Sequence, residues 1–296
     1  MSELRKKICF VSRGLRCSGF LHVPDRVKGG SEAPTIVVAH GFSGVKGMLL
    51  GLSAMFARAG FATLEFDYRY FGESEGEPRC QAFPLEQVED IRNAITWASE
   101  RPEVDSERIG IWGTSYGGAI VLYVGTYDRR VKAVVSQVPY VVSPEQQRAG
   151  DPKWYDEMTK ILLRDRQERY ETGVTKYWKV VSKEEEPCFL PGREAYDEYM
   201  ALKKPEWRNQ VSLESWEKIR EFDSTSMIPL LSPTALLLIA AEKDAIVPLH
   251  VVKEVYRRAL KPKALSVFPV RHFDIYNEPW RSKATGLAID WFREYL

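Results

Sequence analysis

Ser115 is the residue whose surroundings in the sequence most clearly indicate chemistry. It is the central residue of G-T-S-Y-G at positions 113–117, a G-x-S-x-G motif. The motif follows the apolar run Arg108–Trp112 and opens the predicted helix Ser115–Tyr127. On such a tight strand-to-helix turn the two flanking glycines leave room for neighbouring backbone, and the serine hydroxyl is presented to the open. The alternative role is a helix N-cap. We interpret Ser115 as a nucleophile for carbonyl carbon.

A serine hydroxyl needs a base to take its proton at neutral pH, and the later part of the chain supplies suitable groups. Asp244 follows the apolar run Ala235–Ala241, and His272 follows the run Ala264–Phe268. The chain order is therefore Ser, Asp, His, with each residue after a predicted strand. Because the carboxyl ends of parallel strands meet at one edge of a sheet, we expect the three side chains to lie together. His272 would act as the base and Asp244 would orient its ring.

Other side chains compete for these two roles. Glu242 lies in the same loop as Asp244, and Asp244 has the alternative of capping the helix predicted to begin near Pro248. Among the other histidines, His22 lies in a predicted strand and His250 in the first turn of a helix. Surface or capping roles suffice for both of them.

Backbone N–H donors are the third requirement of this chemistry, because negative charge builds on the carbonyl oxygen when the serine adds. The Tyr116 amide follows the nucleophile directly. The second donor is expected from the H-G-F-S-G stretch at 40–44, after the apolar run Thr35–Ala39, with the Phe42 amide pointing at the oxyanion. The alternative is an ordinary loop.

Apolar runs alternate with amphipathic segments through most of the chain. The predicted strands are Lys7–Ser12, Leu15–Val23, Thr35–Ala39, Ala62–Phe66, Arg108–Trp112, Val131–Val135, Ala235–Ala241 and Ala264–Phe268. The predicted helices are 47–59, 86–100, 115–127, 248–260 and 277–295. The first two strands form an antiparallel lead-in, and the later ones barely alternate, as strands buried on both faces do. We expect an α/β fold, with a mostly parallel sheet of the eight-stranded type flanked by helices.

Residues 139–233 interrupt this pattern and are rich in Trp, Tyr, Lys and Glu. Helical segments are predicted there at 151–170, 193–202 and 213–222. We therefore expect a core domain made of residues 1–138 and 234–296, with a helical cap inserted at 139–233. Aromatic side chains of this cap suit the walls of an apolar channel for an acyl chain, and among them we expect Trp154, Tyr177 and Trp178 to bind substrate. The candidate wall residues are Trp154, Tyr155, Tyr170, Tyr177, Trp178, Tyr196, Tyr199, Trp207 and Trp216. Ordinary packing inside the cap is the alternative.

The bulk composition narrows the class of partner. The 296 residues carry a formal net charge of +1, which gives no electrostatic reason to expect nucleic acid or an anionic membrane. The N-terminal residues lack the apolar run of a signal peptide, and the longest apolar stretch, Ala235–Ala241, is too short to span a bilayer. We expect a cytoplasmic protein. The sequence has no nucleotide-binding or metal-ligand motif, so no cofactor is expected.

Together these motifs resemble the α/β-hydrolase superfamily. The resemblance rests on residues 40–42, 67–74 and 113–118 together with Asp244 and His272, and it covers the chain except the cap. Within the superfamily the sequence is similar to dienelactone-hydrolase-like and peptidase S15-like members, and most of all to the fungal polyketide transferase and hydrolase group. Dienelactone hydrolases carry cysteine at the position of Ser115, so the serine here favours ordinary acyl transfer. The turn at 67–74 is expected to be structural.

The resemblance implies a small-molecule acyl substrate bound as an ester or thioester. The acyl carrier protein of a polyketide synthase is one partner that would deliver such a chain. An acyl-enzyme on Ser115 would then pass its chain to water, an alcohol or a carbon nucleophile in secondary metabolism. A general carboxylesterase and a non-catalytic receptor with the same fold are the alternatives. The sequence leaves the oligomeric state open between a monomer and a homodimer.

Overall fold

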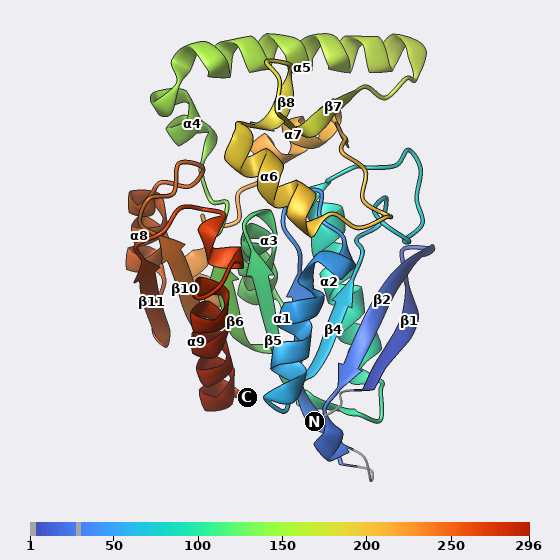
Figure 1. Cartoon of the computed structure of the whole chain (residues 1–296), viewed down its shortest axis with the longest axis vertical. Coiled ribbons are helices and arrows are strands. Elements are labelled where there is room, and N and C mark those ends of the chain that lie inside the picture. The colour runs from blue at the N-terminus through green and yellow to red at the C-terminus, as the bar shows by residue number, and fades with distance from the viewer. Residues whose placement is uncertain (1–3, 28–30) are drawn as a thin grey trace.

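The computed structural model describes residues 4–27 and 31–296, so residues 1–3 and 28–30 of the predicted core domain lie outside the described residues. The main sheet has eight strands in the spatial order β1-β2-β4-β3-β5-β6-β10-β11 (Figure 1). Its strands are β1 (Leu4–Ser12), β2 (Leu15–Val23), β3 (Ala33–Ala39), β4 (Ala62–Phe66), β5 (Val104–Thr114), β6 (Val131–Gln137), β10 (Ala235–Ala241) and β11 (Lys263–Phe268).

The pairing of these strands explains the apolar runs in the sequence. β1 and β2 form an antiparallel hairpin, and β2 is also antiparallel to β4. All the remaining neighbours in the sheet pair in parallel. β3, β4 and β10 are buried at every residue, as expected for strands covered on both faces. The predicted α/β fold with a mostly parallel sheet is confirmed.

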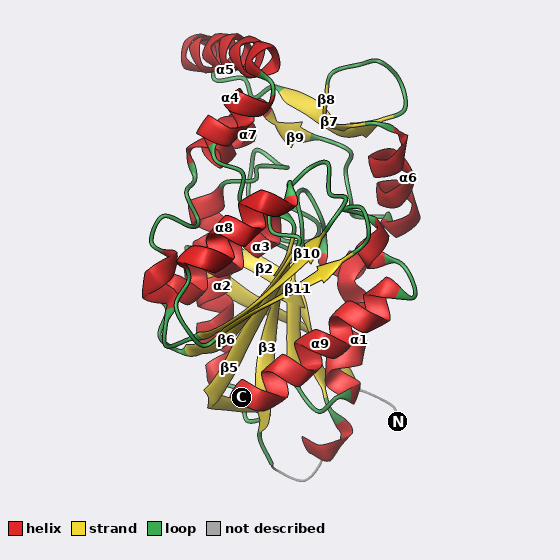
Figure 2. Ribbon diagram, turned by 90° about the vertical axis from the view of Figure 1, so that its left-hand side faces the viewer, coloured by secondary structure: helices red, strands yellow, loops and turns green. Residues whose placement is uncertain are grey.

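Helices form a layer on each face of the sheet (Figure 2). The core helices are α1 (Leu50–Arg58), α2 (Pro84–Ser99), α3 (Tyr116–Tyr127), α8 (Leu249–Arg258) and α9 (Trp280–Tyr295). α1 and α9 cover one face, where the Phe56 ring lies 5.8 Å from Phe292 and 6.5 Å from Trp112 of β5. α2, α3 and α8 cover the other face. Short 3-10 turns occur at Asp25–Val27, Lys46–Leu49, Ile228–Leu231 and Asp274–Tyr276.

The segment 139–233 lies over the end of the sheet that carries the loops after β3, β5 and β10 (Figure 1). It contains α4 (Pro144–Gly150), α5 (Pro152–Thr172), α6 (Arg193–Leu202) and α7 (Leu213–Glu221), with strands β7 (Tyr177–Ser182), β8 (Cys188–Pro191) and β9 (Val211–Ser212). Three of its helices match predicted segments. The cap was expected to be helical, but it also contains three strands. Its small sheet has the order β8-β7-β9. β8 and β9, with four and two residues, are too short for a periodic signal, whereas the six-residue β7 has the β-favouring run Y-W-K-V-V-S and was missed.

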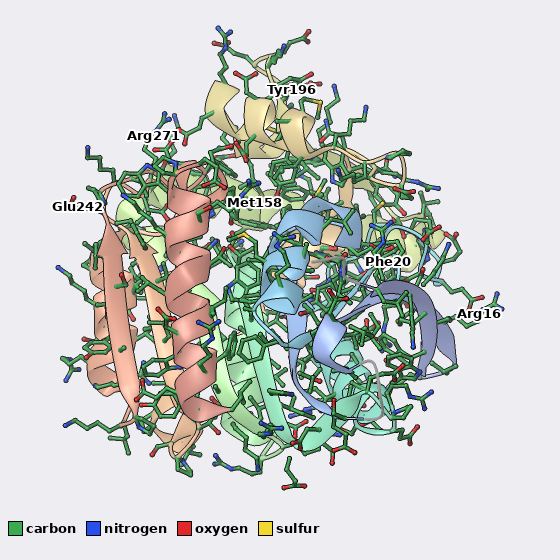
Figure 3. All side chains as sticks on the ribbon, turned by 60° about the horizontal axis from the view of Figure 1, so that its bottom comes forward. Arg16, Phe20, Met158, Tyr196, Glu242 and Arg271 are labelled. Atoms are coloured by element: carbon green, nitrogen blue, oxygen red, sulfur yellow. The ribbon has the colours of Figure 1, made fainter. Side chains whose placement is uncertain are left out.

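The space between the sheet and its helices is filled by side chains (Figure 3). Several predicted elements start or end a few residues away from the expected positions. The predicted helix 47–59 begins with a 3-10 turn at 46–49, and the terminal helix begins at Trp280, directly after Pro279. Judged by length and apolarity together, none of the helices formed by the described residues would span a lipid bilayer.

Two glycines allow α3 to pack tightly against the sheet. A Cβ atom at Gly113 would run into the Gly117 carbonyl, and one at Gly117 would run into the His40 carbonyl. Because both obstacles are backbone, neither can rotate away. The expected collision at these two positions is confirmed.

We expect G117A to lower the free energy of unfolding by about 2 kcal/mol or more, since the chain must shift backbone to admit the methyl group. Gly286 in α9 is a matched control because nothing lies within 4 Å of a Cβ built there. G286A should stabilise the protein by about 0.5–1 kcal/mol through helix propensity alone. Urea and thermal unfolding of the two variants measure both effects, and a G117A protein as stable as the wild type would contradict the packing argument.

Candidate active site

Ser115 occupies a strained turn between β5 and α3. Its backbone has φ 53° and ψ −120°, a conformation that L residues rarely adopt. The Ser115 amide donates to the Gln137 carbonyl at 2.9 Å, and the Ser115 carbonyl accepts from the Tyr140 amide at 2.8 Å. The Ser115 side chain makes no capping hydrogen bond to the helix. The N-cap alternative therefore does not describe this residue.

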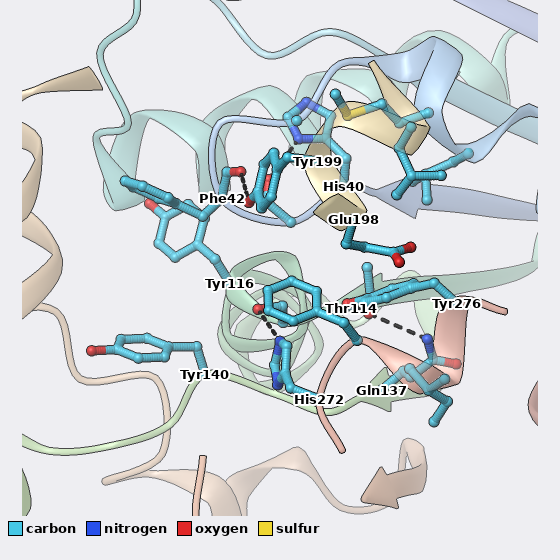
Figure 4. Close-up of a pocket in the computed structure, with 18 of the residues that line it drawn as sticks. His40, Phe42, Thr114, Tyr116, Gln137, Tyr140, Glu198, Tyr199, His272 and Tyr276 are labelled. Carbon is cyan, nitrogen blue, oxygen red and sulfur yellow. Dashed lines mark hydrogen bonds between the residues drawn. The ribbon is translucent and has the colours of Figure 1, made fainter. Parts of the chain in front are cut away.

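The structure brings Ser115, Asp244 and His272 together in one hydrogen-bonded chain. Asp244 Oδ2 lies 2.7 Å from His272 Nδ1, and His272 Nε2 lies 3.1 Å from Ser115 Oγ. His272 faces the pocket in Figure 4. The Asp244 and His272 residues are 8% and 3% exposed, so water competes little for these bonds. A carboxylate next to Nδ1 favours the tautomer with the proton on that nitrogen, which leaves Nε2 free to accept the serine proton.

Asp244, rather than its competitor Glu242, points towards the histidine. Asp244 Oδ1 accepts hydrogen bonds from the amides of Ile246 and Val247, both at 2.8 Å, while Oδ2 is left for His272. Asp244 does not cap α8, whose N-cap residue is Pro248 and which has no side-chain capping bond; Oδ1 instead ties together the loop before the helix. Glu242 is exposed and lies at the outside of the molecule (Figure 3).

The remaining histidines lie apart from this chain. His250 is exposed, which agrees with the surface role expected for it. The surface role expected for His22 is wrong: its ring is buried, and Nε2 lies 3.2 Å from Glu65 Oε1. The reason is that β2 lies inside the sheet, between β1 and β4, so its side chains are covered by helices.

The loop after β3 lies directly beside the nucleophile. A Cβ built on Gly41 would lie 3.6 Å from the Ser115 Cβ. The Gly41 carbonyl lies 3.1 Å from the Gly44 amide that donates to it and 3.0 Å from His40 Nδ1. The Gly41 carbonyl and the Phe42 N–H belong to one trans peptide, so they point in opposite directions. Because the two hydrogen bonds hold the Gly41 carbonyl towards the inside of the loop, the Phe42 N–H points out of the loop. The role of the Phe42 and Tyr116 amides as oxyanion donors stays a prediction.

His40 is buried, and burial lowers the pKa of its imidazole. The ring therefore stays neutral, which suits a structural donor to the Gly41 carbonyl.

The turn after β4 is structural, as expected. The buried carboxylate of Asp67 accepts from the Lys46 and Glu73 amides at 2.7 and 2.9 Å.

A cavity of about 140 Å³ opens at Ser115 and His272 between the core and the cap. Its walls are mainly apolar and aromatic, and among the lining residues are Met48, Leu52, Leu190, Leu202, Ile246, Tyr140, Tyr199, Trp216, Phe273 and Tyr276. Burial raises the pKa of the Tyr199 and Tyr276 hydroxyls, so both remain protonated at neutral pH. Within the described part of the chain, no group of three or more His, Cys, Asp or Glu side chains is arranged to hold a metal ion.

The three residues expected to bind substrate do not line this cavity. Trp154 packs edge-to-face on Trp216 with 6.2 Å between the rings, and Trp178 packs on Phe189 at 5.7 Å. Tyr177 pairs with β9 in the small sheet of the cap. Trp154 contacts a wall residue directly, and Trp178 is linked to Trp216 through Phe189. Two other aromatic residues of the cap that were expected as candidate wall residues, Tyr199 and Trp216, do line the cavity.

Cap helix α6 is tied to both loops that frame the site. The Tyr199 hydroxyl donates to the Phe42 carbonyl at 2.7 Å, so the cap holds the loop that carries the Phe42 amide. Glu194 accepts from Arg271 at 3.1 Å, next to His272. Sequence reasoning missed these ties because they depend on how the cap docks.

Comparisons with known proteins agree with this architecture. The model of the alpha/beta hydrolase fold family matches residues 34–279, and the chain therefore belongs to that family. An uncharacterized 31.7 kDa protein from the traX-finO intergenic region of Escherichia coli is 30% identical over 279 residues, which cover 91% of this chain and 93% of that protein.

Two fungal relatives carry functional names. The thiohydrolase aneE of Aspergillus aculeatus is 27% identical over 88% of this chain and 83% of its own. The polyketide transferase grgF of Penicillium sp. is 26% identical over 80% of this chain and 79% of its own. The crystal structure of the alpha/beta hydrolase GrgF from Penicillium sp. sh18 has a TM-score of 0.83 at 22% identity, over 99% of both chains. The resemblance to the fungal polyketide transferase group is confirmed.

The two carboxylates of the β10–α8 loop provide a test of the site. We expect D244N to slow the reaction of Ser115 with a fluorophosphonate by on the order of 10⁴-fold, because an amide at this position favours the wrong imidazole tautomer. E242Q, in the same loop but exposed, should react at the wild-type rate. Intact-mass spectrometry over time measures both rates, and equal rates for the two variants would rule out the assignment of Asp244.

Proposed function

We propose that the protein is a serine-dependent hydrolase or acyltransferase that acts on ester and thioester carbonyls through an acyl-enzyme. The observation that carries this proposal is the hydrogen-bonded chain from Asp244 through His272 to Ser115. His272 takes the hydroxyl proton as Ser115 Oγ bonds to the carbonyl carbon, and Asp244 stabilises the resulting imidazolium.

The tetrahedral intermediate places negative charge on the former carbonyl oxygen. The amides of Phe42 and Tyr116 donate hydrogen bonds to it, and the hydrogen bonds that fix the Gly41 carbonyl support this arrangement. When the intermediate collapses, the bond from carbon to the leaving sulfur or oxygen breaks, and His272 gives its proton to the leaving group. An acceptor then loses a proton to His272 and attacks the acyl-enzyme, which restores the Ser115 hydroxyl.

The substrate class follows from the cavity and the relatives. The apolar and aromatic walls suit an acyl chain, and relatives named thiohydrolase and polyketide transferase favour a thioester carrying a polyketide or related chain. In this proposal the chain arrives on the acyl carrier protein of a polyketide synthase and is released to water or passed to a second acceptor in secondary metabolism. A general carboxylesterase would use the same chemistry, with preference for simple oxoesters.

Covalent labelling of the nucleophile tests the proposal. We expect a fluorophosphonate to add to Ser115 at neutral pH, because the base and the N–H donors that serve the acyl transfer also serve attack on phosphorus. Peptide mass spectrometry should locate the adduct at Ser115, and S115A should lose both the adduct and the turnover of acyl thioesters, with unchanged thermal unfolding.

S282A is the control, since Ser282 is exposed and lies on α9. This variant should be labelled and should turn over thioesters like the wild type. Wild-type protein that stays unlabelled would favour the receptor alternative, and labelled protein that hydrolyses simple oxoesters faster than acyl thioesters would favour the carboxylesterase.

A further inference from the structure

Glu198 brings a carboxyl group into an otherwise apolar part of the Ser115 cavity. It extends from cap helix α6 and lines the same cavity as Ser115 and His272. Figure 4 shows its carboxyl group projecting towards Tyr276. One oxygen, Oε2, accepts a hydrogen bond from Asn277 Nδ2 at 3.0 Å. The other oxygen, Oε1, is buried and has no hydrogen-bond partner among the described residues.

The polar groups around Glu198 are engaged elsewhere. Arg281 also lines the cavity, but its guanidinium donates to Glu278 at 2.8 Å. The guanidinium of Arg271 donates to Glu194 at 3.1 Å and to Asp274 at 2.8 Å. The Tyr276 hydroxyl lies 2.8 Å from Thr114 Oγ1 and pairs with it. In the described structure, therefore, Oε1 remains an unused acceptor inside the cavity.

Glu198 is half-buried as a residue, and its Oε1 atom is buried without a hydrogen bond from a described protein group. Burial raises the pKa of the Glu198 carboxyl; the Asn277 bond opposes this rise, while the nearby charges of Asp274 and Glu194 add to it. Leaving such a group without a partner costs free energy that an apolar side chain at the same place would not cost. A cavity that only held a plain hydrocarbon chain would have no use for it.

We infer that Glu198 is a specificity-determining residue that receives a hydrogen bond from a hydroxyl group on the acyl chain bound at Ser115. The inference rests on the proposed function, because it names the class of chain that the site accepts. The Oε2–Asn277 bond fixes the carboxyl group and leaves Oε1 to the substrate. The ligand class is therefore a hydroxylated acyl chain.

A hydroxyl group suits this position better than an ammonium group. Leu202 and Ile275 line the same cavity, and an ammonium group would lose much more hydration free energy there than a neutral hydroxyl group. A hydroxyl can donate to the carboxylate and can also pair with the protonated acid, so it binds in both states of Glu198.

The test compares N-acetylcysteamine thioesters whose chains differ only by one hydroxyl, placed at successive carbons, with the matching amino chains. We expect wild-type kcat/KM to be about tenfold or more higher for the hydroxylated chain at one position than for the plain chain. E198L should lower this ratio about tenfold or more, and E198Q, which keeps the shape of the side chain, should also lower it. D197N is the control on the exposed side of the same helix and should keep the wild-type ratio.

Fluorophosphonate labelling of Ser115 is measured in parallel, so that a failure here is distinguishable from a failure of the acyl-enzyme proposal. Normal labelling of wild type with equal kcat/KM for plain and hydroxylated chains at every position would overturn the inference. An E198L variant that loses activity equally on both chains would also overturn it, since that would indicate a purely structural tie to Asn277. A higher kcat/KM for the amino chains than for the hydroxylated chains would also overturn the inference, because Glu198 would then bind a cationic group of the substrate.

Discussion

The close approach of α3 to the ends of β3 and β5 is the constraint on which the site depends. At Gly117 the helix comes so close to the carbonyls of Ala39 and His40 that a Cβ atom would collide with them, and a Cβ atom at Gly113 would collide with Gly117. A turn this tight places Ser115 at φ 53°. The same contacts bring the end of β3 beside the serine, so nucleophile and predicted oxyanion loop are positioned by one packing interaction. The strain is held by parallel strands on both sides of β5.

The cap completes the site from above through few but well-placed contacts. Its apolar and aromatic side chains close the cavity, while α6 reaches down to the loops that carry the Phe42 amide and the His272 ring. Glu198, which we infer binds substrate, therefore lies on the same helix as Tyr199 and Glu194, which hold the two loops. Substitutions on α6 will change rate and selectivity together unless they fall on its exposed side.

The core of the fold and the three side chains of the hydrogen-bonded chain could be predicted because local signals coincide there. β10 has the predicted bounds Ala235–Ala241, since an unbroken apolar run is bordered by Thr234 after Pro233 and by the charged Glu242. The choice of Asp244 over Glu242 also followed from position. The cavity wall could not be predicted, because it depends on which face of each cap helix turns inward. Trp154 was expected to bind substrate, but it lies behind Trp216, and nothing in local sequence ranks the two. Glu198 became visible only once the cavity around it was known.

The ties of α6 also bear on how a long chain gets in and out. Lifting this helix would break the Tyr199 bond to Phe42 and the Glu194 bond to Arg271, and both loops of the site would lose a support at that moment. A change in the position of α6 would therefore change the geometry around Ser115. Under the proposed acyl-enzyme mechanism, this coupling makes the position of the cap a control on the rate at which Ser115 reacts.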